Sequence, residues 1–144
     1  MKKNSNKELA FIDANFFIYL NCISDDMQRK PYEDFYVKII TSYKLSTDIL
    51  VLDELIYISK KKYGAPYDLT IDFIKRAILP YVNILPINAN ILDEFLSTLE
   101  LYSLKPSDAI HVAVMKMNNI SVIVSEDDEF DKIPWIKRIW IQKY

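Results

Sequence analysis

The chain has 144 residues, of which 51% are hydrophobic and 26% charged, as is typical of a globular protein with a sizeable core. The net charge of −2 argues against a nucleic-acid binder that relies on charge alone, and the only glycine, Gly64, excludes a glycine-rich phosphate loop. The single cysteine excludes an intrachain disulfide, which fits a reducing compartment. The N-terminal segment Met1–Glu8 is polar and no apolar run is long enough to span a membrane. These features together predict one cytoplasmic domain over residues 1–144.

The first elements are predicted from short apolar runs. Leu9–Ile12 is apolar, too short for a helix, and ends in Asp13, so we predict a buried strand there. A helix is predicted over Asn15–Ile23. The polar segment Ser24–Pro31 favours a loop, and Glu33–Tyr43 has the apolar spacing of an amphipathic helix.

Two further helices are predicted in the middle of the chain. Ser46-Thr47-Asp48 can cap a helix from about Leu50 to Tyr63, and Gly64 marks its end. Pro66 and Asp68 start another helix, which continues to about Leu79 before a proline.

Strands and helices alternate over the remaining residues. Strands are predicted over Val82–Ile87, Ile120–Val124 and Ile136–Ile141, and helices over Asn88–Tyr102 and Asp108–Met117. This alternation predicts an α/β fold with a mostly parallel sheet covered by helices on both faces. In such sheets, active sites form beyond the C-terminal ends of the strands.

Several acids are predicted at that edge. Asp13 ends the first strand, Asp127 follows the strand at 120–124, and Asp108 begins a helix so apolar that it must be buried. Helical spacing makes Glu54 at least partly enclosed. Carboxylates in one enclosed place repel each other, and a divalent cation such as Mg²⁺, which takes oxygen ligands, is the natural compensation.

Each of these acids also has a simpler structural explanation. Asp13 can be a turn former or helix cap, and Asp108 can cap its own helix. Asp127 lies in a run of acids that is typical of a solvated turn. Glu54 can pair with Lys61 or another surface lysine, and Asp53 fits the helical period equally well. The agreement of four acids on one sheet edge is what favours a metal site.

Four segments, taken together and in this order, resemble the motifs of the PIN domain family. Phe11-Ile12-Asp13-Ala14-Asn15 is similar to the opening D-x-N motif, and the other three each contain one further acid. These three are Leu50–Leu55, Lys105–Ala113 and Val122–Phe130. The resemblance spans residues 11–130, nearly the whole chain.

The resemblance implies a three-layer α/β/α sandwich with a Mg²⁺- or Mn²⁺-dependent endoribonuclease site. Asn15 would orient the first acid, and Ser125 stands where the family usually has threonine or serine. The short chain is most similar to VapC-type toxins, which implies a type II toxin–antitoxin system with an RNA substrate, a cognate antitoxin protein and a homodimer. The catalytic and metal-binding acids implied by the four motifs are Asp13, Glu54, Asp108 and Asp127.

The sequence departs from the family pattern at two places. Glu126 stands where a small or amide residue is common, so the sequence leaves open which of the neighbouring acids faces the metal. The spacing from Ser125 and Phe130 favours Asp127. Leu45–Ile49 is weak as a strand, so we expect the second strand to be short or absent.

Two other functions fit the same pattern. One is a PIN-like nuclease in RNA processing or DNA metabolism with no toxin role. The other is an inactive binding or scaffold domain, which the presence of all four acids disfavours. The only histidine, His111, could face the site, but a packed or hydrogen-bonded structural role is favoured because an oxygen-ligand site needs no imidazole.

Overall fold

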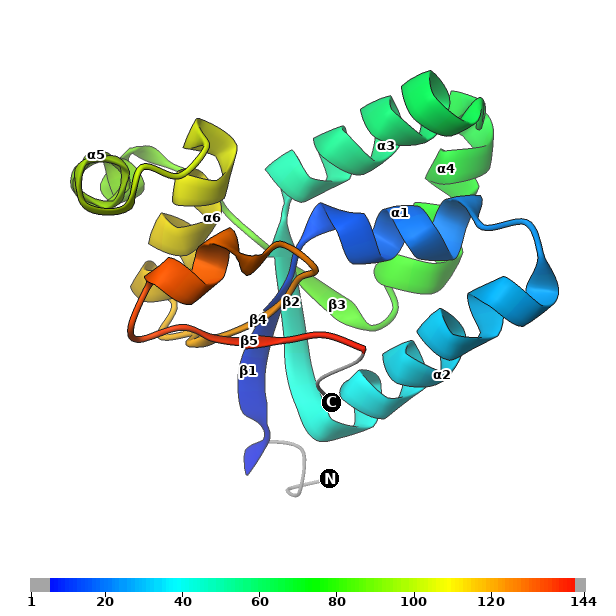
Figure 1. Ribbon diagram of the computed structural model, residues 1–144, viewed down its shortest axis with the longest axis horizontal. Helices are drawn as coiled ribbons and strands as arrows, with labels where there is room; N and C mark the ends of the chain where they lie inside the picture. Colours follow the sequence, from blue (N-terminus) through cyan, green and yellow to red (C-terminus); the bar gives the residue numbers. More distant parts are fainter. Residues whose placement is uncertain (1–5, 142–144) are drawn as a thin grey trace.

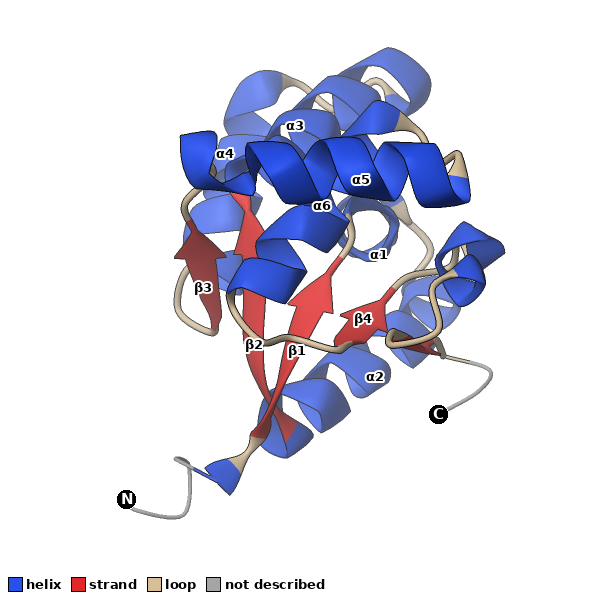
Figure 2. Cartoon of the chain, turned by 90° about the vertical axis from the view of Figure 1, so that its left-hand side faces the viewer, coloured by secondary structure: helices blue, strands red, loops and turns tan. Residues whose placement is uncertain are grey.

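A computed structural model describes residues 6–141 and has a five-stranded sheet at its centre (Figures 1 and 2). The order is β3-β2-β1-β4-β5, and every pair of neighbours is parallel. The strands are β1 (Glu8–Ile12), β2 (Tyr43–Asp48), β3 (Val82–Leu85), β4 (Val122–Val124) and β5 (Lys137–Ile139).

Helices cover both faces of this sheet. In Figures 1 and 2, α5 and α6 lie on one side of the strands and α1 and α2 on the other. The predicted α/β/α sandwich with a parallel sheet is therefore confirmed. The helices are α1 (Ala14–Cys22), α2 (Asp26–Ser42), α3 (Ile49–Tyr63), α4 (Tyr67–Phe73), α5 (Leu92–Tyr102) and α6 (Pro106–Met117). A π-helical segment over Ile74–Ile78 continues α4, and short 3₁₀ segments lie at Ala89–Ile91 and Asp128–Lys132.

The central strands are buried because helices cover both of their faces. All three residues of β4 and the last three of β1 are buried, as expected for a parallel sheet that presents neither face to water. β1 lies between β2 and β4, with Phe11 in register with Ser46 on one side and Ile123 on the other. The residue that follows β1 therefore lies at the middle of the sheet edge.

The second strand corrects the sequence-based expectation. A short or absent strand over Leu45–Ile49 is wrong, since β2 has six residues and pairs with two neighbours. Ser46, Thr47 and Asp48 are all buried. They are tolerated because their polar groups are bonded: the Thr47 hydroxyl, for example, donates to the Ile12 carbonyl at 2.8 Å.

The start of α2 is a second correction. The loop predicted over Ser24–Pro31 is helical from Asp26 onward, and Pro31 lies inside the helix. The Asp25 carboxylate caps the helix by accepting from the Gln28 N–H at 2.9 Å. Arg29 is paired with acids one turn away on each side, so the polar residues form a solvated helix rather than a loop.

Two predictions concern the ends of the chain. The single domain over residues 1–144 and the polar segment Met1–Glu8 both include residues outside the described range, so these parts stay predictions. Between residues 6 and 141, no helix is long and apolar enough to cross a membrane.

Candidate metal centre

Asp13 joins the end of β1 to the start of α1. Its Oδ1 accepts from the Ala14 N–H at 2.8 Å, and its Oδ2 accepts from the Ser125 hydroxyl at 2.7 Å. Its own N–H donates to the Val124 carbonyl at 3.0 Å, and the residue is 6% exposed. Asp13 is therefore a helix cap and, at the same time, a buried carboxylate at the C-terminal edge of the sheet.

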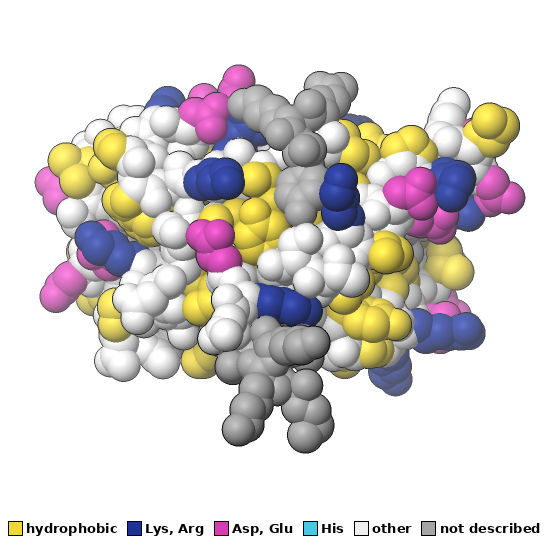
Figure 3. All heavy atoms as spheres, turned by 90° about the horizontal axis from the view of Figure 1, so that it is seen from below, with side chains coloured by type: hydrophobic (Ala, Val, Ile, Leu, Met, Phe, Trp, Pro, Cys, Tyr) yellow, Lys and Arg dark blue, Asp and Glu magenta, His cyan; other side chains and the backbone are white. Residues whose placement is uncertain are grey.

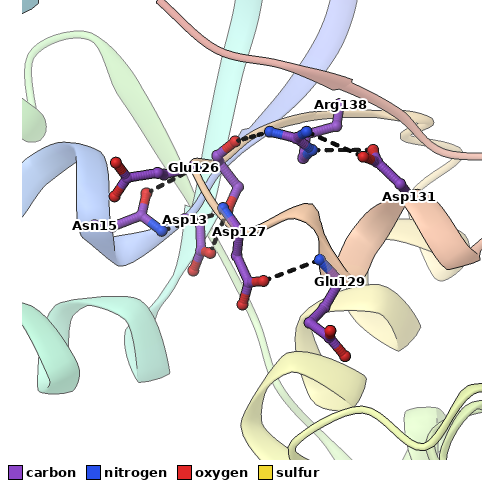
Figure 4. A network of polar contacts seen from close by, with 8 residues as sticks. Asp13, Asn15, Glu126, Asp127, Glu129, Asp131 and Arg138 are labelled. Atoms are coloured by element: carbon purple, nitrogen blue, oxygen red, sulfur yellow. Dashed lines mark hydrogen bonds and ion pairs between the residues drawn. The ribbon is translucent and has the colours of Figure 1, made fainter.

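A network around Ser125 ties this carboxylate to the loop after β4 (Figure 4). The Ser125 hydroxyl, which donates to Asp13, accepts from the Asp127 N–H at 3.0 Å and from the Asn15 amide at 3.4 Å. The Asn15 carbonyl in turn accepts from the Glu126 N–H at 3.3 Å. Asn15 and Ser125 thus lie where they hold the first acid and the following loop together.

The neighbouring acids Glu126, Asp127 and Asp128 of this loop differ in their surroundings. Glu126 and Asp128 are exposed, whereas Asp127 is half-buried. The Glu126 carboxylate accepts from the Tyr19 hydroxyl, and in Figure 4 its side chain points away from Asp13. Asp127 Oδ1 accepts from the Glu129 N–H at 2.9 Å. Asp127 is the member of this acidic run that the fold turns toward the site.

Asp108 lies in the first turn of α6 and is 6% exposed. Burial, followed by the charge of Asp13, raises the pKa of Asp108 to about 6, and Asp127 adds to the shift. The N-cap of α6 is Lys105, and no side chain caps the helix. A simple capping role for Asp108 is therefore wrong, and the crowding of carboxylates that the sequence indicated is present.

This shift makes the stability of the metal-free protein depend on pH. The pKa of Asp108 is raised in the folded state from 3.8, so its contribution to stability is present in acid and is lost as pH rises through about 6. We expect Asp108→Asn to stabilise the metal-free protein at neutral pH by about 1 kcal/mol, allowing for solvent screening, but not in acid. Urea denaturation at both pH values, with the exposed Asp128→Asn as control, measures this. An equal effect at both pH values would contradict it.

Glu54 reaches the same region from α3. It is half-buried, whereas its neighbour Asp53 is exposed. Burial, followed by the charge of Asp13, raises the pKa of Glu54. Lys61, the surface partner considered for Glu54, instead has its Nζ 5.3 Å from the ring centroid of Tyr57. The geometry thus favours Glu54 over Asp53.

A buried pair between Asp48 and His111 is the feature that the sequence did not predict. Asp48 ends β2, is 0% exposed, and caps α3 through a 3.0 Å bond from the Val51 N–H to Oδ1. Its Oδ2 lies 2.8 Å from His111 Nδ1. The sequence indicates Asp48 only as a possible cap, but because it ends β2 it also belongs with the acids at the C-terminal ends of strands.

His111 is hydrogen-bonded and 1% exposed, which agrees with the packed or hydrogen-bonded role favoured from the sequence. It also lies at the acidic site. Burial lowers its pKa, but the hydrogen bond and charge of Asp48, with the charges of Asp13 and Asp108, raise it above its usual value overall. Asp13, Asp108 and His111 each offer a ligand atom within 4.8 Å of the others. This buried, mostly anionic donor set fits a divalent cation.

A pocket lies elsewhere in the fold. It has a volume of about 430 Å³ and lies at the starts of β2 and β3, where Tyr43, Lys44, Tyr81 and Asn83 are among its lining residues. Figure 3 views the molecule from below, where hydrophobic and basic side chains lie next to each other near the centre. This pocket is at the opposite ends of the strands from the acids and is not part of their site.

The comparisons with known proteins agree with this geometry. A family model described as "PIN domain" matches residues 10–136. No curated protein matches the chain in sequence.

Solved structures of similar fold span nearly the whole chain. They include VapBC2 from Rickettsia felis bound to a promoter DNA fragment, with 17% identity, a TM-score of 0.67, and coverage of 92% of this chain and 98% of that one. VapC20 from Mycobacterium tuberculosis, described as a toxin that cleaves the sarcin-ricin loop, has 15% identity, a TM-score of 0.69, and coverage of 88% and 96%. VapBC-1 from nontypeable Haemophilus influenzae has 19% identity, a TM-score of 0.68, and coverage of 94% and 99%.

Proposed function

Because this chain belongs to the PIN domain family, we propose that it is a metal-dependent endoribonuclease that hydrolyses RNA phosphodiester bonds. The observation that carries the proposal is the convergence of the buried carboxylates of Asp13 and Asp108, with Glu54 and Asp127 close enough to interact electrostatically with them. Such a set is suited to holding a divalent ion against a phosphodiester.

In this proposal, Mg²⁺ or Mn²⁺ is held directly or through water by Asp13, Glu54, Asp108 and Asp127. The bound ion supplies a Lewis acid and an activated water. Ser125 keeps the Asp13 carboxylate in place through its hydroxyl. Lys105 is exposed, and its positive charge acts to lower the pKa of both Glu54 and Asp108. It therefore lies near enough to the acids to attract an RNA phosphate.

We also propose that the chain is one cytoplasmic domain and the toxin of a type II toxin–antitoxin pair. Its support is the likeness in fold and length to VapC20 and to the VapBC proteins. A cognate antitoxin and a second copy of the chain both require apolar surface. Large apolar side chains are exposed on α3 and α5: Ile49, Tyr57, Leu92, Leu96 and Leu101.

Cleavage of labelled RNA by the metal-stripped protein tests the enzymatic proposal. We expect cleavage when Mg²⁺ or Mn²⁺ is added and none when the ions are chelated. A DNA of matched sequence serves as the control substrate. Absence of RNA cleavage with either ion would count against the enzyme, and preferential cleavage of DNA would support the DNA nuclease alternative.

Sedimentation and co-expression test the assembly. We expect a dimer at tens of micromolar, and growth arrest on expression that a co-expressed antitoxin relieves. A monomer at that concentration would contradict the dimer. Expression without any effect on growth would contradict the toxin role and leave the nuclease assignment to the cleavage assay.

The neighbouring acids on α3 provide a matched pair for testing the site. Glu54→Gln is expected to slow cleavage and weaken metal binding about 10–100-fold, because it removes a half-buried charge close to Asp13. Asp53→Asn removes a charge one residue away that is exposed, so we expect parental rates. The measurement is the cleavage rate as a function of metal concentration, and the reverse ranking would exchange the two assignments.

A further inference from the structure

Three consecutive lysines form a basic cluster in the last turn of α3: Lys60, Lys61 and Lys62. All three are exposed, in a chain whose net charge is −2. In Figure 1, α3 runs from the end of β2 to α4, so the cluster lies at the far end of the helix that carries Glu54. It concentrates positive charge on an element that the candidate metal centre already uses.

Carboxylates do not neutralise this cluster. Arg29, Lys30 and Arg76 each pair with an acid four residues away on their own helix. The positions three and four residues from each lysine of the cluster carry no acid. Within residues 6–141, no carboxylate forms an ion pair with any of the three. The helix dipole favours a cation in this turn, but it does not require three.

Each ammonium group of the cluster lies over a tyrosine ring instead. Lys60 Nζ is 4.3 Å from the ring centroid of Tyr67 on α4, and Lys62 Nζ is 5.5 Å from that of Tyr63. Lys61 contacts a third tyrosine in the same way. The rings of Tyr63 and Tyr67 are exposed. Lysines interleaved with exposed aromatic rings are typical of sites for single-stranded nucleic acid, where cations contact phosphates and rings stack on bases.

The helical period places Lys61 on the same face of α3 as Glu54. It follows Glu54 by seven residues, or nearly two turns, so the two side chains leave the helix in similar directions, about 10 Å apart along its axis. Every nucleotide of an RNA strand carries a phosphate. A strand that has one phosphate at the acids and follows this face therefore brings other phosphates to the cluster.

We propose that Lys60, Lys61 and Lys62, with the rings of Tyr63 and Tyr67, bind a single-stranded part of the RNA substrate a few nucleotides from the cleaved phosphate. The inference rests on the proposed endoribonuclease function and adds a surface that holds the RNA outside the metal centre. The cluster contributes to binding and not to the chemical step, because it lies about two helical turns from Glu54.

The salt dependence of RNA binding tests this proposal. Fluorescence anisotropy of a labelled single-stranded RNA is measured with metal-stripped protein in chelator, so that no RNA is cleaved. Replacing all three lysines of the cluster by glutamine is expected to reduce the slope of log affinity against log salt by about 2, since each phosphate contact on a single strand contributes about 0.7. Equal slopes for variant and parent, or no RNA binding by the parent, would overturn the proposal.

A second triple variant removes the same charge elsewhere: Lys44→Gln, Lys116→Gln and Lys137→Gln. These lysines are exposed and lie near the starts of β2 and β5 and in the last turn of α6, away from the acids. We expect this control to keep the parental slope, and thermal melts check that both variants fold. A slope reduced equally in the control would show an effect of net charge alone and overturn the proposal.

Cleavage kinetics separate binding from chemistry. With Mg²⁺ at low salt, the cluster variant is expected to raise KM about 10-fold or more and to leave kcat unchanged. Cleavage by the parent with no change of slope in the variant would remove the cluster and keep the enzyme, whereas a reduced slope without parental cleavage would do the reverse. Parental RNA binding by a variant that a co-expressed antitoxin no longer neutralises would assign the cluster to an acidic protein segment and overturn the proposal.

Discussion

Asp13→Asn is expected to abolish RNA cleavage while leaving the fold intact. Asparagine retains an oxygen that can accept from the Ala14 N–H, and it is as good a helix N-cap as aspartate. The Ser125 hydroxyl, which donates to Oδ2, keeps the two hydrogen bonds that it accepts from Asp127 and Asn15 and loses only this acceptor. What the variant lacks is the negative charge at the middle of the sheet edge.

The expected loss is at least about 100-fold in rate, the scale on which one missing electrostatic contact slows an enzyme. Single-turnover cleavage with saturating Mg²⁺ measures it, and a thermal melt of the metal-free variant checks the fold. Asp25→Asn is a matched control, because Asp25 also caps a helix through its carboxylate but is exposed at the start of α2. Cleavage by Asp13→Asn at the parental rate would show that Asp13 is a structural cap alone.

Asp48→Ala is expected to cause the largest loss of stability, about 3–5 kcal/mol in the free energy of unfolding. Removing one partner of a buried ion pair leaves the other uncompensated, and His111 is 1% exposed. The variant also loses the cap of α3, where Asp48 accepts from the Val51 N–H. Because domains are stable by about 5–15 kcal/mol, this is a large share of the total.

Urea denaturation of the metal-free protein measures this loss, with Asp25→Ala as the matched cap. That control removes only an exposed cap and is expected to cost about 1 kcal/mol. Asp48→Asn, which keeps the cap but loses the charge, should fall between the two. Equal losses in Asp48→Ala and Asp25→Ala would mean that the pair with His111 contributes nothing to stability.

The sequence by itself determined the layers of the fold and two of the acids. Alternating apolar segments require a parallel sheet between helices, because each strand and helix has to bury its apolar side. Asp13 follows a buried strand, and Asp108 begins a buried helix, so both had to lie near the C-terminal edge of the sheet. These are consequences of local patterns, which can be detected along the chain.

The tertiary structure decided which polar residues are buried. β2 looks polar in sequence, but Thr47 and Asp48 are buried because their partners, Ile12 and His111, come from other elements. Asp48 and His111 are 63 residues apart, and no local spacing brings them together.

The choice between neighbouring acids was decided in the same way. Glu54 is half-buried and its pKa is raised by burial and by the charge of Asp13, whereas Asp53 is exposed. The Glu126 carboxylate accepts a hydrogen bond from the Tyr19 hydroxyl instead. Apolar burial follows local periodicity, whereas the burial of a polar group depends on a partner that only the folded chain supplies.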